Sequence, residues 1–258
     1  MDIAEHNRRA WNEAAIKECD WSIPVSAEQI DAAREGEWSV ILTPRKPVPR
    51  EWFPELQGAK VLCLASGGGQ QAPILAAAGA DVTSFDLSEE QLLLDDQLAE
   101  AHSLPLDTSQ GDMRDLSSFD DGSFDLVFNP ASNLFIPDVR PLWAECHRVL
   151  KPRGMLMSGS MNPSFFLFNH EQAEKEGVLE VKYPLPYSDL TSPHSEDDGP
   201  STERSKTLEF GHTLEDLIGG QTECGFHITG FYEDYWSDDA TPLNVYSPTS
   251  FATKAVKM

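Results

Sequence analysis

Residues 60 to 70 read Lys60-Val-Leu-Cys-Leu-Ala-Ser-Gly-Gly-Gly-Gln70, and this stretch decides the fold. Its apolar half, residues 61–64, predicts a buried strand that runs directly into three glycines. Glycine allows a tight turn and leaves room for a ligand against the main chain. A helical segment and a second strand follow, and that strand ends at Asp86, 17 residues after Gly69. This order of strand, glycine turn, helix, strand and acid is typical of a nucleotide or nucleoside site.

The alternation of strands and helices continues to residue 160. After the first strand, the expected elements are helix 70–79, strand 81–86, helix 89–101, strand 105–109, strand 124–129, helix 138–149 and strand 154–160. Mostly apolar strands of this kind indicate a parallel sheet. Two last strands, 226–235 and 250–256, are joined by a loop too short for a crossover helix and are therefore expected to be antiparallel. We predict an α/β fold: a doubly wound, mostly parallel seven-stranded sheet with helices on both faces and an antiparallel last strand.

The flanking segments do not follow this alternation. Residues 1–57 contain two expected helices and an extended, proline-broken stretch, which together predict an N-terminal helical and extended cap. Residues 163–210 are rich in aromatic residues and prolines and predict an insertion that forms a substrate lid. The predicted core is then 58–162 together with 211–258.

Composition narrows the function classes. The chain has 258 residues and a net charge of −24, which disfavours nucleic acid and anionic membrane surfaces as partners. The sequence has neither an 18-residue apolar run nor an apolar signal core near its start, so we expect a cytoplasmic protein with a small-molecule substrate. The four cysteines are far apart, which indicates reduced thiols and no metal site. The oligomeric state stays open.

Four features, in this order and at these spacings, resemble the class I S-adenosylmethionine (SAM)-dependent methyltransferases, in particular the type 11-like group that acts on small molecules. They are the turn Leu64-Ala-Ser-Gly-Gly-Gly69, the acid Asp86, the segment Gly111-Asp-Met113, and the pair Ser123-Phe-Asp-Leu-Val-Phe128 and Glu145-Cys-His-Arg-Val-Leu-Lys-Pro-Arg-Gly154. The resemblance implies SAM as cofactor and methyl transfer as activity. It implies that Asp86 accepts from ribose hydroxyls and that Asp112 accepts from the adenine amine.

The cofactor-binding residues expected from the resemblance and from the strand ends form one set. They are Trp11, Ala65, Ser66, Gly67, Gly69, Gln70, Asp86, Leu87, Asp112, Met113 and Asn129. Asn129 belongs to this set because it follows a strand at the edge where such sheets bind ligands. Trp11 has two open interpretations, as a core-facing aromatic or as a lid residue whose ring faces the sulfonium.

The glycine turn departs from the family pattern at two positions. Cys63 stands where the family has an acid that often helps to hold the methionine ammonium, and Ala65 stands where it has the first glycine. We expect Ala65 to be tolerated with a negative φ. The segments Trp11-Asn12, Leu42-Thr-Pro-Arg-Lys-Pro-Val-Pro49, Gln70-Gln71 and His212-Thr-Leu-Glu-Asp216 also resemble an uncharacterised bacterial subgroup without a known substrate.

The catalytic residues are less well defined by the sequence. A general base is needed only where the acceptor must lose a proton early, and the candidates are His212 and Tyr183, which end or line the predicted lid. Two alternatives remain at this point. One is an NAD(P)-dependent oxidoreductase, because Gly67, Gly69 and Ala72 fit the dinucleotide pattern, although the chain has no Tyr-x-x-x-Lys pair. The other is a SAM-binding protein without catalysis.

Overall fold

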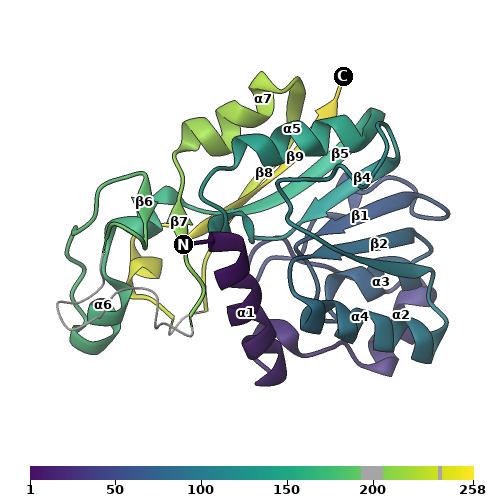
Figure 1. Ribbon diagram of the computed structural model, residues 1–258, viewed down its shortest axis with the longest axis horizontal. Coiled ribbons are helices and arrows are strands. Elements are labelled where there is room, and N and C mark those ends of the chain that lie inside the picture. The colour runs from purple at the N-terminus through teal and green to yellow at the C-terminus, as the bar shows by residue number, and fades with distance from the viewer. Residues whose placement is uncertain (193–205, 238–239) are drawn as a thin grey trace.

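The computed structural model describes residues 1–192, 206–237 and 240–258 (Figure 1). Residues 193–205 of the predicted insertion lie outside the described residues. Within the described part, no helix is both long enough and apolar enough to cross a membrane.

Seven strands form one sheet in the order β3-β2-β1-β4-β5-β9-β8. The bounds are β1 Lys60–Leu64, β2 Asp81–Asp86, β3 Leu106–Gln110, β4 Phe124–Asn129, β5 Leu150–Met161, β8 Phe226–Asp234 and β9 Ser250–Lys257. The pairs from β3 to β5 are parallel, and β9 runs antiparallel to both β5 and β8. The predicted sheet, including its antiparallel last strand, is confirmed.

Helices cover both faces of this sheet (Figure 1). The helices are α1 Ile3–Ile16, α2 Ala27–Arg34, α3 Gln71–Ala77, α4 Glu89–His102, α5 Arg140–Val149, α6 His170–Glu176 and α7 Gly220–Glu223. Helices α2, α3 and α4 pack on one face, where Ile30 and Leu75 join the first apolar cluster. Helix α5 packs on the other, where Trp143 is fully buried in the second cluster. Helix α1 lies against α4.

Local sequence features set several element boundaries. Ser26 and Gln29 form a capping box at the start of α2, and Ser88 caps α4 by accepting from the backbone N–H of Gln91. Strand β5 begins four residues earlier than expected, because Leu150 already pairs with Phe124 before a register irregularity.

The proline-broken stretch, residues 40–49 and called here the proline segment, crosses the carboxyl edge of the sheet. Leu42 is buried, and its carbonyl accepts from the backbone N–H of Ala131 over 2.9 Å. The segment also runs tightly over β5, since a Cβ added to Gly159 would lie only 1.8 Å from the Leu42 carbonyl oxygen. Gly159 therefore allows the close approach of two backbones.

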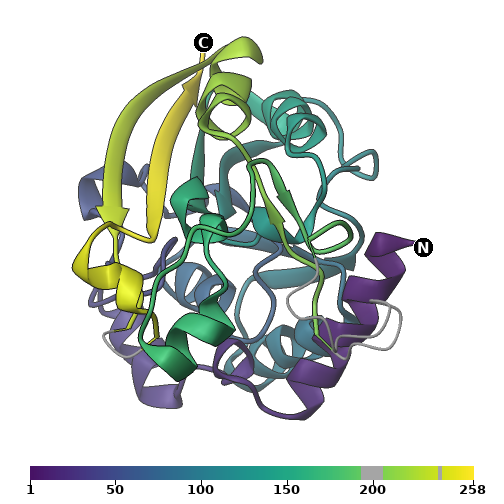
Figure 2. The ribbon, with the colours of Figure 1, turned by 90° about the vertical axis from the view of Figure 1, so that its left-hand side faces the viewer.

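The described part of the insertion packs beside this edge (Figure 2). It contains α6 and a two-stranded sheet of β6 Tyr187–Ser188 and β7 Phe210–Gly211. A third apolar cluster joins it to the core through Leu134, Met161, Phe166, Tyr183 and Tyr187.

Candidate functional site

A cavity of about 410 Å³ opens at the carboxyl ends of the parallel strands. The strand order reverses between β1 and β4, and open α/β sheets bind their ligands outside such a reversal. Most of the lining is apolar. Of the predicted cofactor residues, nine line the cavity: Trp11, Ala65, Ser66, Gly67, Gln70, Asp86, Leu87, Asp112 and Met113.

The three glycines of the turn have different roles. Gly67 lines the cavity, and a Cβ there would lie 2.8 Å from the Cβ of Gln91. Gly68 and Gly69 have φ values of +105° and +72° and do not line it. A Cβ on Gly68 would lie 2.4 Å from the Trp21 carbonyl oxygen, and one on Gly69 would lie 2.8 Å from the Pro24 Cβ. Two of the glycines thus make room for the N-terminal part of the chain itself.

Residues 20–25, called here the N-terminal clasp, are bound to this turn by hydrogen bonds. The backbone N–H of Val25 donates to the Gly69 carbonyl over 2.8 Å. The Gln70 amide donates to the carbonyls of Asp20 and Ile23, and the Gln91 amide donates to the Ser22 hydroxyl over 2.7 Å. The clasp therefore fixes the outer side of the turn whose inner side faces the cavity.

Ala65 does not have the negative φ that we expected from the sequence. Its φ is +48°, in the left-handed region. The chain leaves the sheet directly after Leu64, while the Ala65 N–H still donates to the Phe85 carbonyl over 2.7 Å. A Cβ in this region costs about 1–2 kcal/mol.

Replacing Ala65 with glycine should therefore raise the free energy of unfolding by about 0.5–1 kcal/mol, because the backbone strain is larger than the entropy that glycine loses. Guanidinium unfolding measures this change. Ala32→Gly, inside α2, is the matched control and should have the opposite sign, a loss of about 1 kcal/mol. A destabilised Ala65→Gly variant would contradict the argument.

Asp86 ends β2 at the wall of the cavity. Its Oδ1 accepts from the backbone N–H of Ser88 over 2.9 Å, and its Oδ2 accepts from that of Gly67 over 3.1 Å. Burial raises the pKa of Asp86, and the two backbone donors partly oppose this shift. Each carboxylate oxygen keeps acceptor capacity beyond these bonds, so the side chain can also receive ribose hydroxyls.

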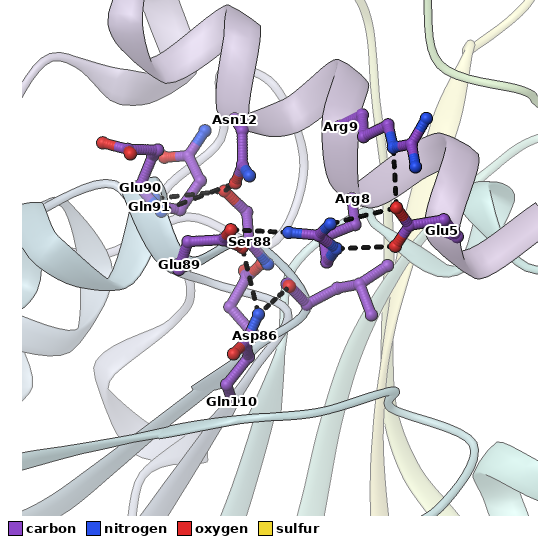
Figure 3. A network of polar contacts seen from close by, with 11 residues as sticks. Glu5, Arg8, Arg9, Asn12, Asp86, Ser88, Glu89, Glu90, Gln91 and Gln110 are labelled. Carbon is purple, nitrogen blue, oxygen red and sulfur yellow. Dashed lines mark hydrogen bonds and ion pairs between the residues drawn. The ribbon is translucent and has the colours of Figure 1, made fainter.

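Helix α1 docks on this corner through polar side chains (Figure 3). The Ser88 hydroxyl donates to Asn12 Oδ1 over 2.6 Å, so Asn12 is linked through Ser88 to the loop that holds Asp86. Arg8 pairs with Glu5 on its own helix and with Glu89 at the start of α4. These ion pairs are partly exposed and add little stability individually, but they orient α1 over the cavity.

Asp112, which the sequence predicts to face adenine, has a cation beside it. It accepts from the backbone N–H of Arg114 and from its guanidinium, through Nε and Nη2. Both side chains line the cavity. The residue before Asp112 is Gly111. A side chain would not fit there, because a Cβ would lie 2.2 Å from the Phe85 ring.

The residues present fit SAM. Ser66 and Gln91 line the cavity, and their buried atoms Ser66 Oγ and Gln91 Oε1 have no hydrogen-bond partner among the described residues, so a polar ligand that reaches them would satisfy them. Trp11 also lines it and packs edge-on against Phe135 at 5.1 Å between ring centroids. Acceptors for ribose, free polar groups at the glycine turn and an aromatic wall therefore surround one space.

Four predicted site residues lie outside the lining: Gly69, Asn129, His212 and Tyr183. The buried Asn129 amide donates to the Leu64 carbonyl and to Ser132 Oγ, each over 2.9 Å, which joins the ends of β1 and β4. His212 Nε2 lies 3.0 Å from the Asn133 carbonyl, and burial lowers the pKa of its ring. Tyr183 packs against Tyr187 in the third apolar cluster.

Sequence reasoning missed other residues at this site. Trp21, Met161 and Trp236 line the cavity from a short 3-10 helix, a strand end and a loop that no motif marks. Thr43 lines it from the proline segment, to which no binding role was assigned. Asp95 was also missed. It lies on α4 and is fully buried beneath the glycine turn. Its spacing from Leu92 places an acid on the core-facing side of an amphipathic helix, which is the pattern that could have revealed it.

Comparisons with known proteins agree with this geometry. A family model described as "Methyltransferase domain" matches residues 62–158. The chain is 46% identical over 256 residues to the "Uncharacterized methyltransferase YbaJ" of Bacillus subtilis (strain 168), with 99% of both chains covered. It is 31% identical over 132 residues to a "Ubiquinone biosynthesis O-methyltransferase" of Bordetella avium (strain 197N), covering 47% of this chain and 53% of that protein.

Among solved structures, an S-adenosylmethionine-dependent methyltransferase from Mesorhizobium loti has a TM-score of 0.61 at 19% identity, covering 81% of this chain and 95% of that one. This likeness supports the fold. The similarity to the Bacillus protein extends over nearly the whole chain. It favours methyl transfer over the oxidoreductase alternative. The chain belongs to the class I SAM-dependent methyltransferases.

Proposed function

We propose that this enzyme transfers the methyl group of SAM to a small, largely apolar molecule bound at the end of the cavity near β5 and β8. Asp86 ends β2 and Asp112 follows β3, on one side of the strand order. Met161 ends β5 and Trp236 follows β8, on the other side, and Pro44 of the proline segment lies with them in the lining. This apolar wall away from the cofactor acids is the observation that best supports the proposal.

The acceptor atom in this proposal attacks without help from a protein base. Bound SAM supplies a methyl group already activated by its sulfonium. The titratable residues in the described lining are Asp86, Asp112, Arg114 and Glu209, and all of them have interactions within the protein. The chain then mainly aligns the acceptor and excludes water. A neutral amine, or a thiol or phenol that is already ionised, fits this requirement.

The cover of the cavity is proposed to come from residues 1–57 and from the described part of residues 163–210. Ile3 and Trp11 of α1 line it, as do Thr207 and Glu209 from the end of the insertion. Asn7 joins these two parts, because its amide donates to the Leu208 carbonyl and its Oδ1 accepts from the Leu208 N–H. Such a cover would keep water away from the reacting atoms.

A pH profile tests the proposed chemistry. With labelled SAM at saturating concentration and panels of apolar amines, thiols and phenols, kcat/KM for the acceptor should rise with pH along the pKa of each acceptor, because no protein group acts as the base. His212→Gln, which can still donate to Asn133, should keep the activity within about threefold. A profile that is the same for all acceptors, or a hundredfold loss in His212→Gln, would overturn this mechanism. SAM binding without turnover on any panel would favour the non-catalytic alternative.

A further inference from the structure

Asp95 is a buried carboxylate that makes two short hydrogen bonds beneath the glycine turn. Its side chain lies on α4 with 0% exposure. Oδ1 accepts from the backbone N–H of Gly69 over 2.8 Å, and Oδ2 accepts from the hydroxyl of Ser84 over 2.6 Å. The carboxylate therefore connects α4 to both the turn and β2.

Cys63 lies on the same face of the sheet as Ser84. The two residues are register partners on adjacent parallel strands, so their side chains point to the same side. Burial and the nearby Asp95 raise the pKa of the Cys63 thiol, which stays protonated and uncharged. Beneath the turn, α4 therefore places the carboxyl group of Asp95 next to a position of β1 that has only a neutral thiol.

We propose that Asp95 is the positioning residue of the glycine turn, and that its carboxylate supplies from α4 the negative charge that the family resemblance places at position 63. It acts through the Gly69 N–H on a turn whose other half, Ser66 and Gly67, lines the cavity. Asp95 itself does not line the cavity, so it acts on SAM binding through the turn and through its charge.

The proposal predicts two pH effects of opposite sign. Burial raises the pKa of Asp95 to about 7, and the charges of Asp86 and Asp96 add to this, while Ser84 and Gly69 oppose it. The pKa in the folded protein is above that of the unfolded chain, so this group's contribution to stability decreases as pH rises from about 4 to about 7. Bound SAM has a positive charge that favours the ionised carboxylate, so SAM affinity should increase between pH 6 and 8.

Asp95→Asn tests the charge with the shape retained, because its Oδ1 can still accept from Gly69. We expect calorimetric SAM affinity to rise several-fold from pH 6 to 8 in the unmodified protein. At pH 8, SAM affinity should be about tenfold weaker in Asp95→Asn than in the unmodified protein. The affinity of this variant should be nearly independent of pH. Glu100→Gln is the matched control, since Glu100 is an exposed acid on the same helix. Equal affinities and equal pH dependence in Asp95→Asn and Glu100→Gln would overturn the proposal.

Placing an acid on β1 at position 63, together with the removal of Asp95, gives a second, independent test. Asp95→Ala leaves Gly69 and Ser84 without their buried acceptor, and Cys63→Asp alone places two carboxylates side by side. Each single variant should lower the thermal midpoint and weaken SAM binding at least tenfold. The double variant Cys63→Asp/Asp95→Ala should recover most of both losses. A folded double variant that binds SAM no better than Asp95→Ala would contradict the proposal. If the double variant does not fold, the pH profile of SAM affinity in Asp95→Asn decides whether the proposal holds.

Discussion

We expect the replacement of Asp86 with alanine to lower SAM affinity by about 100-fold or more. The variant removes the carboxylate that we expect to receive the ribose hydroxyls, and hydrogen bonds to a charged group contribute about 1.5–3 kcal/mol each. It also removes the acceptor that holds the N–H groups of Gly67 and Ser88 over 3.1 and 2.9 Å. The turn then loses a fixed point at the place where it faces the cavity. Isothermal titration calorimetry at pH 8 measures the effect directly.

Two further variants separate the loss of a contact with SAM from an effect on folding. Asp86→Asn keeps one oxygen acceptor and should fall between the unmodified protein and Asp86→Ala. Asp81→Ala, at the exposed start of the same strand, should leave affinity unchanged. If Asp86→Ala binds SAM within threefold of the unmodified protein, Asp86 is not a ribose ligand.

Replacing Gly159 with alanine destabilises the protein by about 3 kcal/mol, the upper end of the usual cost of overpacking. The added Cβ would lie 1.8 Å from the Leu42 carbonyl oxygen and 3.0 Å from the Ala131 nitrogen. Both are backbone atoms joined to each other by a hydrogen bond, so no side-chain rotation can relieve the clash. The proline segment would have to move off the sheet.

That movement also changes the cavity, because Leu42, Thr43 and Pro44 line it. We therefore expect weaker acceptor binding together with the lower midpoint of guanidinium unfolding. Gly219→Ala is the control, since its added Cβ meets nothing closer than 3.7 Å and its backbone is already helical. Similar midpoints of guanidinium unfolding for the two alanine variants would show that the proline segment can move without a loss of stability.

The sequence was sufficient for the fold because the patterns that specify it are local. The apolar run of β1 and the strand ranges 81–86 and 124–129 agree with the structure. Apolar runs and turn residues act over a few positions, so the sequence alone indicates these elements.

The site was predicted only in part, because much of it depends on distant segments that meet. Gly68 and Gly69 make room for Trp21 and Pro24, about fifty residues earlier in the chain, and no turn pattern indicates this. The positive φ of Ala65 follows from where β1 must end against Phe85. His212 has a suitable residue type, but it lies against Asn133, outside the cavity lining. Residue type alone does not distinguish these cases.

The position of β9 has a consequence for synthesis. Strand β9, residues 250–257, lies between β5 and β8 and forms hydrogen-bonded ladders with both. While a ribosome still holds these residues, β8 lacks its neighbour and the edge of β5 is an open template for other chains. The nascent protein therefore exposes a hydrogen-bonding edge until the ribosome has released residues 250–257, and chaperone occupancy should persist to that point.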